Sequence, residues 1–138
     1  MKLKDLVNVS GIVGRLLGEK WRANVRYKLD TYADLANKDL ERFNKIRLEL
    51  YEKYGDKEPV IDENGAKVLD KQGEVQTQYK LRAEEVENFN KELQELVEEE
   101  CNLKFNPLTL DDFGDFEFEQ FEIKALIAAG LVKDPMEE

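Results

Sequence analysis

Five acidic residues crowd the segment 111–119, and their side chains are of the type that binds hard cations. Carboxylate oxygens are the ligands that Mg²⁺ and Ca²⁺ prefer in proteins. An EF-hand needs ligands at positions 1, 3, 5 and 12 of its loop with glycine at position 6, and the spacing here does not match. We therefore expect no metal and no cofactor, and interpret the acids as a solvated face that caps a helix. They are Asp111, Asp112, Asp115, Glu117 and Glu119.

A second candidate is the segment 15–28, in which basic and aromatic residues are interleaved. Such a mixture can stack on nucleobases and contact phosphates. It also suits a corner between helices, where arginine side chains cover apolar surface and pair with acids, or a surface for a protein partner. These interpretations stay open, although the net charge of −10 disfavours a nucleic acid. The residues that we expect to contact a partner are Trp21, Arg22, Arg26 and Tyr27.

A third candidate is the acidic segment 84–100. Its simplest role is solubility, and the alternatives are docking onto a basic protein surface and imitation of a nucleic-acid backbone. Lys80, Arg82 and Lys91 interrupt the continuous negative surface that imitation would need. The acids that we assign to a partner surface are Glu95, Glu98, Glu99 and Glu100.

Side chains that commonly perform catalysis are scarce in this chain. It contains no histidine and a single cysteine, Cys101, and Ser10 is its one serine. The usual Ser-His and Cys-His nucleophile systems and Cys/His zinc sites therefore cannot be assembled from it. We interpret Cys101 as a small buried hydrophobe, and we predict no catalytic, metal-binding or cofactor-binding residue and no enzymatic activity.

The amino-terminal residues and the charge distribution bear on location. Asp5 and Asn8 interrupt the apolar stretch that a signal peptide needs, and no run of about 18 apolar residues occurs. Residues 1–50 hold 11 Lys/Arg and 7 Asp/Glu, so the negative charge belongs to the rest of the chain. We therefore expect a cytoplasmic protein that does not enter a membrane.

Apolar residues recur at steps of three or four in two long segments and predict helices over 22–54 and 77–100. In the first helix the recurring positions run from Val25 to Tyr54, and in the second from Tyr79 to Val97. A helix of about 30 residues spans about 45 Å, which is long for a small domain. We therefore expect the two helices to pack antiparallel as a coiled-coil-like pair.

Smaller elements flank this pair. The spacing of apolar residues predicts a helix over 5–18, and the alternation of Leu103 and Phe105 with polar residues predicts a short strand over 102–106. A last helix is predicted over 115–130, with Asp115 as its N-cap. Its expected buried side carries Phe118, Phe121, Leu126 and Ala129.

The segment between the long helices predicts a β-hairpin over 58–76. Asn64-Gly65 favours a type I′ turn, in which Asp62 would face Lys67 and Ile61 would face Val68. A second turn signal, DKQG at 70–73, repeats the spacing of Asp62 to Gly65. The sequence thus predicts one domain over 1–138 in the α+β class, mainly helical, in which a long-helix pair is capped by a hairpin.

Three stretches, in order, carry a resemblance to known proteins: DENGAKV at the hairpin, VENFNKELQELVEEE after it, and LTLDDFGDFEFEQFEIKALIAAGLV near the end. With the helices before them they resemble an uncharacterised family of small bacteriophage proteins over most of the chain. The helix, hairpin, helix plan is also similar to prefoldin, in architecture alone. The phage resemblance implies an accessory protein made in the bacterial cytoplasm, and it assigns no activity to particular residues.

These patterns together favour a non-enzymatic protein that binds another protein and so modulates or inhibits a host factor. One alternative is a structural, tail-associated or chaperone protein of phage assembly. Another is a nucleic-acid-binding protein that uses the segment 15–28. Self-association of the chain is a further arrangement that the long helices allow.

Overall fold

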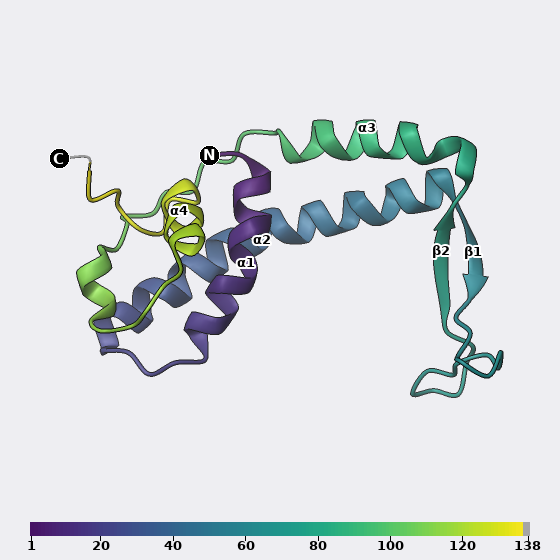
Figure 1. Ribbon diagram of the computed structural model, residues 1–138, viewed down its shortest axis with the longest axis horizontal. Coiled ribbons are helices and arrows are strands. Elements are labelled where there is room, and N and C mark those ends of the chain that lie inside the picture. The colour runs from purple at the N-terminus through teal and green to yellow at the C-terminus, as the bar shows by residue number, and fades with distance from the viewer. Residues whose placement is uncertain (137–138) are drawn as a thin grey trace. The chain divides into compact units, whose positions relative to one another are not determined.

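The computed structural model describes residues 1–136, which form four α-helices, two short 3-10 helices and one antiparallel sheet of two strands (Figure 1). This confirms the predicted α+β, mainly helical class. The elements in order are α1 (Leu3–Leu17), α2 (Ala23–Tyr54), β1 (Gly55–Pro59), β2 (Thr77–Leu81), η1 (Ala83–Glu85), α3 (Val86–Val97), η2 (Leu110–Phe113) and α4 (Gln120–Ala128). The chain divides into two compact units: unit 1 comprises residues 1–42 and those from 96 onward, and unit 2 comprises residues 43–95.

The helices α1 and α2 form where the sequence predicts them. In α1 the buried residues follow helical spacing, and the Asp5 carboxylate accepts the backbone N–H of Lys2 at 2.8 Å and so closes the first turn. In α2 the buried stripe runs through both units. Its members are Val25, Leu29, Tyr32, Ala36, Phe43 and Leu50.

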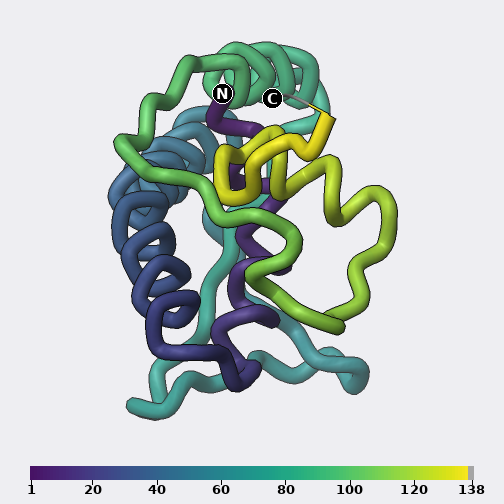
Figure 2. Tube along the Cα trace, turned by 90° about the vertical axis from the view of Figure 1, so that its left-hand side faces the viewer, coloured from purple at the N-terminus to yellow at the C-terminus, as the bar shows by residue number. Residues whose placement is uncertain are grey.

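The core of unit 1 forms where α1 and α4 pack together (Figure 1 and Figure 2). Tyr32 of α2 is fully buried there; its hydroxyl donates to the Ala129 carbonyl at 2.6 Å, and its ring meets that of Phe105 edge-on at 5.2 Å. Burying each large side chain contributes about 1.5–3 kcal/mol before entropy is counted. The fully buried leucines of this unit are Leu6, Leu16, Leu29, Leu108, Leu126 and Leu131.

The strand predicted over 102–106 is wrong. Leu103 and Phe105 are half-buried and their polar neighbours are exposed, so the alternation is real, but the segment has no strand partner among the described residues. Pairing occurs instead at Leu108, which forms a single parallel bridge with Val132. A period of two therefore marked an extended, half-buried segment and not a strand of a sheet.

The last helix is shorter than predicted. It begins at Gln120, and its N-cap is Glu119, whose backbone N–H donates to the Glu122 carboxylate at 2.8 Å, so Asp115 is not the cap. Phe116 and Phe118 lie in an extended segment before the helix and contact each other at 4.8 Å. Phe121 is 69% exposed and was wrongly placed on the buried side, whereas Leu126 and Ala129 are buried as predicted. The alternation FEFE of period two explains the late helix start.

The helix predicted over 77–100 is wrong in its first nine residues, where β2 and η1 precede α3. Thr77–Leu81 pairs antiparallel with Gly55–Pro59, because its β-branched and aromatic residues suit a strand. In unit 2, α3 runs back beside the last turns of α2 (Figure 1). The rings of Tyr51 and Phe89 lie 4.7 Å apart, and Lys53 pairs with Glu92 at 3.2 Å. The expected helix pair is present, but α3 has 12 residues.

Candidate functional site

The aromatic residue of the basic segment, Trp21, is committed to unit 1. Its indole N–H donates to the Leu16 carbonyl at 2.7 Å, and its ring contacts those of Phe113 and Phe116 at 5.3 and 5.4 Å. Trp21 is half-buried as a result. It therefore closes the connection between α1 and α2, whereas Tyr27 is 74% exposed on α2.

Two arginines of the same segment also have intramolecular partners. Arg26 donates to the Leu17 carbonyl at 2.6 Å and pairs with Asp30 at 3.2 Å. Arg15 pairs with Glu122 of α4. The acids that neutralise these arginines are therefore not those of the segment 84–100, and Arg22 is left as an exposed cation of the predicted site.

The glutamates predicted as a partner surface are divided between the two units. Glu95 is exposed in unit 2. In unit 1 the Glu98 carboxylate accepts the ammonium groups of Lys2 at 2.5 Å and Lys4 at 2.8 Å. The hydrogen bond from Lys2 is the largest cause that lowers the pKa of Glu98 to about 2. This part of the acidic segment serves to hold the first turn of α1.

The backbone around these acids completes the same junction. The Glu99 carbonyl accepts the N–H of Leu3 at 2.8 Å, and Glu100 lies 3.6 Å from the amino group of Met1. Cys101 follows, with its backbone N–H donating to the Met1 carbonyl at 2.8 Å. Cys101 is half-buried, and burial raises the pKa of its thiol, which favours the unreactive protonated form.

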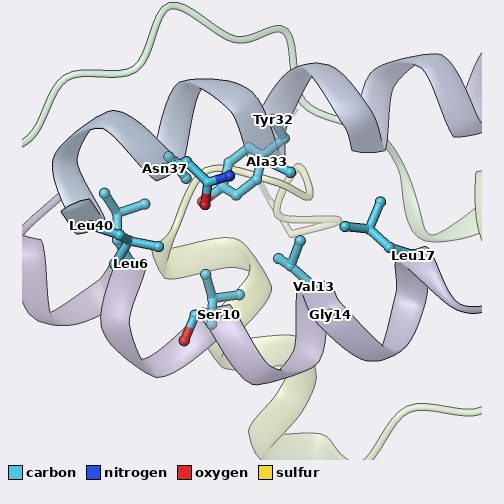
Figure 3. A pocket seen from close by; sticks show the side chains of 11 residues that line it. Leu6, Ser10, Val13, Gly14, Leu17, Tyr32, Ala33, Asn37 and Leu40 are labelled. Carbon is cyan, nitrogen blue, oxygen red and sulfur yellow. The ribbon is translucent and has the colours of Figure 1, made fainter. Parts of the chain in front are cut away.

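A cavity of about 170 Å³ lies between α1 and α2 in unit 1 (Figure 3). Its walls are mainly apolar, including Leu6, Val13 and Leu40, and its polar side chains are Ser10 and Asn37. The Ser10 hydroxyl donates to the Val7 carbonyl at 2.8 Å. Tyr32 also lines the cavity, and burial raises the pKa of its phenol. This arrangement holds no base beside a nucleophile, and among residues 1–136 no three metal-ligand side chains gather.

The tip, residues 60–76, is built in unit 2 from two turns of the same design. In the first turn an Asp62 carboxylate oxygen accepts the backbone N–H groups of Asn64 and Ala66, each at 2.9 Å. Eight residues later Asp70 accepts those of Gln72 at 2.9 Å and Glu74 at 3.0 Å. Gly65 and Gly73 both have φ of +80°, which glycine adopts without strain.

A closed ring of three backbone hydrogen bonds joins Val60, Val68 and Gln76, which lie before, between and after the two turns of the tip. The N–H of Val60 donates to the carbonyl of Gln76 at 2.9 Å, that of Gln76 to Val68 at 2.8 Å, and that of Val68 to Val60 at 2.9 Å. The backbone of the tip is thus ordered by its own hydrogen bonds. Its side chains form no buried core, since each residue from 60 to 76 is half-buried or exposed.

The predicted register of the hairpin is wrong by one residue. Ile61 pairs with Lys67 and not with Val68, and strand pairing extends beyond 58–76 to Gly55 and Leu81. A type I′ turn would need positive φ at Asn64, and among the described residues only glycines have positive φ. The Asp62 carboxylate explains the difference, because it binds the N–H of Asn64 and favours a longer turn.

Apolar side chains project from the tip into solvent. Ile61 and Leu69, which occupy equivalent positions of the two turns, are each 57% exposed, and Val75, which pairs with Leu69, is 40% exposed. The surrounding charges of residues 60–76 are four acids and two lysines. Three exposed aliphatic side chains among charged neighbours make the tip a candidate surface for contact with another protein.

No family model, curated protein or solved structure matches this chain. The resemblance to a phage family therefore stays a prediction. Within the part of the chain that the structure describes, no helix combines the length and the apolar character needed to cross a bilayer.

The tip is not among the residues that the sequence predicts to contact a partner. The signal was present, because V-I-D-E-N-G at 60–65 and V-L-D-K-Q-G at 68–73 share valine, an aliphatic residue, aspartate and glycine at a period of eight. On its own, this repeat predicts only two turns. A strand that buried one face would hide Ile61 or Leu69, and neither has a packing partner that covers it.

Proposed function

We propose that this chain is a non-enzymatic accessory protein that binds another protein through the tip, residues 60–76. The observation that carries the proposal is the exposure of Ile61, Leu69 and Val75 on a backbone whose hydrogen bonds are already formed. Binding by an ordered loop avoids much of the entropy that a flexible loop would lose. Exposed aliphatic side chains on such a loop favour association with an apolar surface.

The charge of the tip indicates the chemistry of the partner. Glu63 and Glu74 are exposed beside the apolar side chains, whereas the carboxylates of Asp62 and Asp70 are used by the turns. Lys67 and Lys71 are exposed as well, so a partner with a small apolar depression and charged groups of both signs at its border would complement this surface. Modulation of a host factor and a role in phage assembly are both forms of such binding.

The nucleic-acid alternative has less support. Trp21 packs against two phenylalanine rings, and Arg15 and Arg26 are paired with Glu122 and Asp30. The groups that would stack on bases and contact phosphates are therefore largely occupied within unit 1. The other cations of the segment, Lys20, Arg22 and Lys28, make a weak electrostatic site in a chain of net charge −10.

The test compares tip variants in quantitative affinity capture from bacterial lysate. The variant Ile61→Ser/Leu69→Ser/Val75→Ser removes the exposed aliphatic surface, and we expect at least one protein that the wild type retains to fall about tenfold or more. Phe121→Ser is the control, because Phe121 is also an exposed apolar residue, 69% exposed, but lies on α4 of unit 1. It should retain the same protein as the wild type does.

A second variant separates the order of the tip from its side chains. Asp62→Ala/Asp70→Ala removes four side-chain hydrogen bonds to the backbone and keeps Ile61 and Leu69. We expect it to bind more weakly than the wild type and to show faster amide exchange within 60–76. If the capture pattern is the same for the wild type and both tip variants, the proposal is wrong.

A further inference from the structure

The hydrogen bonds at the two ends of the β1–β2 ladder determine which of its residue pairs are hydrogen-bonded and which are not. Arg82 donates its backbone N–H to the Tyr54 carbonyl at 3.0 Å, and Val60 donates to Gln76 at 2.9 Å, at opposite ends of the ladder. Hydrogen-bonded and non-bonded pairs alternate in an antiparallel ladder. The pairs Asp56–Lys80 and Glu58–Gln78 are therefore the hydrogen-bonded ones.

The same alternation of bonded and non-bonded pairs leaves the outer edge of β2 unpaired. Thr77, Tyr79 and Leu81 occupy the non-bonded positions, so their backbone N–H and C=O groups point away from β1. The sheet has two strands, and among residues 1–136 no other backbone group bonds to these three N–H groups. An edge of this kind is a template for a further strand.

The outer edge of β1 is less suited to pairing. Its outward positions are Gly55, Lys57 and Pro59. Proline has no N–H to donate, and a lysine on an edge is a common means of preventing strand addition. The two edges of the ribbon are therefore unequal, and β2 presents the better one.

A groove of about 400 Å³ adjoins the β2 edge. Thr77, Gln78 and Tyr79 line it from β2, the other lining residues come from α2, and β1 contributes none. In Figure 1 β2 is the strand on the α2 side of the ribbon. The groove thus lies where a strand added to β2 would place its side chains. The α2 residues that line it are Asn44, Arg47, Leu48 and Tyr51.

The lining indicates what such a strand carries. Leu48 is 51% exposed and Tyr51 is half-buried, so they offer apolar contact. Arg47 is the charged member of the lining, and its guanidinium lies 5.9 Å from the centre of the Phe43 ring. Glu52, 3.5 Å from the Tyr79 hydroxyl, does not line the groove. Arg47 therefore makes the groove a local cationic site in a chain of net charge −10.

We propose that an extended segment of a partner protein adds to β2 as a third strand, with an aliphatic side chain against Leu48 and a carboxylate beside Arg47. Main-chain hydrogen bonds to Thr77 and Tyr79 supply affinity, and the groove supplies selectivity. This surface is separate from the exposed side chains of the tip and has its own test.

The probe is an immobilised array of seven-residue peptides in which valine and threonine alternate. Three sets of the array differ at one central position, which carries aspartate, lysine or serine. We expect the full-length protein to be retained by the aspartate set in preference to the other two. Dissociation constants of the best peptide of each set are then measured by fluorescence anisotropy.

Two proline variants test the edge itself. Thr77→Pro removes an outward N–H from β2, and Lys57→Pro removes one from β1, and both positions lie outside the hydrogen-bonded pairs of the ladder. We expect Thr77→Pro to weaken peptide binding about tenfold and Lys57→Pro to leave it unchanged. Far-ultraviolet circular dichroism checks that both variants fold.

A charge reversal tests the groove in a way that unfolding cannot imitate. Arg47→Glu should transfer the preference from the aspartate set to the lysine set. The triple serine variant of the tip should bind the peptides as the wild type does. The proposal is overturned if no set is retained, if the three sets bind equally, or if Lys57→Pro weakens binding as much as Thr77→Pro.

Discussion

Arg15 of α1 and Glu122 of α4 form an ion pair whose two side chains lie in unequal surroundings: the glutamate is 5% exposed and the arginine 49%. The buried carboxylate also accepts the backbone N–H of Glu119 at 2.8 Å, and the guanidinium lies 5.6 Å from the centre of the Phe116 ring. One pair therefore joins α1 to the first turn of α4. Its loss would leave a charge inside unit 1.

Replacing Arg15 by methionine should destabilise the protein. The Glu122 carboxylate would lose its cation in a buried position, and we expect a loss of about 1–3 kcal/mol, below the full range for buried pairs because the arginine is half exposed. Urea unfolding at neutral pH measures this change. Arg22→Met is the control, since Arg22 is exposed, and should change stability by about 0.5 kcal/mol or less. Equal effects would contradict the assigned role.

The pairing of Glu98 with Lys2 and Lys4 should make the stability of the protein depend on pH in the acidic range. Its pKa is lowered from 4.5 to about 2, so the folded state is favoured above pH 4.5 and this contribution disappears as the pH falls towards 2. We expect the stability of Glu98→Gln to lie below that of the wild type near neutral pH and to converge with it in that window. Urea unfolding at a series of pH values gives both curves.

The lysines provide the control for this acid dependence. In the background Lys2→Met/Lys4→Met, the change Glu98→Gln should have a smaller effect between pH 4.5 and 2 than it has in the wild type. The pKa of Lys2 is raised above 10.5, chiefly by the same hydrogen bond, so its own contribution is complete below that pH and is lost above it. A wild-type curve parallel to that of Glu98→Gln throughout would refute the pairing.

Trp21 should act as a structural residue. Trp21→Ala removes its contacts with Phe113 and Phe116 and its hydrogen bond to Leu16, and we expect a loss of about 2–4 kcal/mol. Tyr27→Ala, at a position 74% exposed, should cost about 0.5 kcal/mol or less. Thermal unfolding followed by circular dichroism compares the two. A tolerant Trp21 would return this residue to the list of partner contacts.

Replacing either of two glycines by alanine should change the stability of the protein in opposite directions. At Gly55 an added Cβ would lie 2.7 Å from the Tyr51 carbonyl oxygen and 2.9 Å from that of Lys80, so Gly55→Ala should destabilise by about 1–3 kcal/mol. At Gly11 of α1 nothing lies within 4 Å of an added Cβ, and the alanine should stabilise by about 0.5–1 kcal/mol. Urea unfolding decides the signs, and a stabilising Gly55→Ala would disprove the close approach of backbone.

The long helix α2 could be predicted because its periodicity persists over many turns, from Val25 to Leu50. The error at 77–85 arose where two periods coincide. Tyr79 and Ala83 fit a helix at a spacing of four, while Thr77, Tyr79 and Leu81 fit a strand at a spacing of two. The pairing with Gly55–Pro59 decides between them, and it is a contact that no local pattern contains.

The candidate site was harder to predict than the fold, because charge patterns do not reveal which partner a charge has. Glu98 was assigned to another protein, yet its cations are Lys2 and Lys4, 96 and 94 residues away in the same chain. Trp21 similarly meets Phe113 across a large separation. The repeat at Asp62 and Asp70 was visible, but the ring that joins Val60, Val68 and Gln76 depends on three segments meeting at once.

The ring of Val60, Val68 and Gln76 has a consequence for how the protein evolves or is redesigned. Because backbone hydrogen bonds already join the segments of the tip, we expect that the exposed side chains at 61, 69 and 75 can be replaced without disturbing the helices. Under the proposed function, selection for a new partner would act on these positions while folding stays unchanged. The exposed positions of the tip should therefore tolerate substitution, and their sequence should diverge faster than that of the buried stripe of α2.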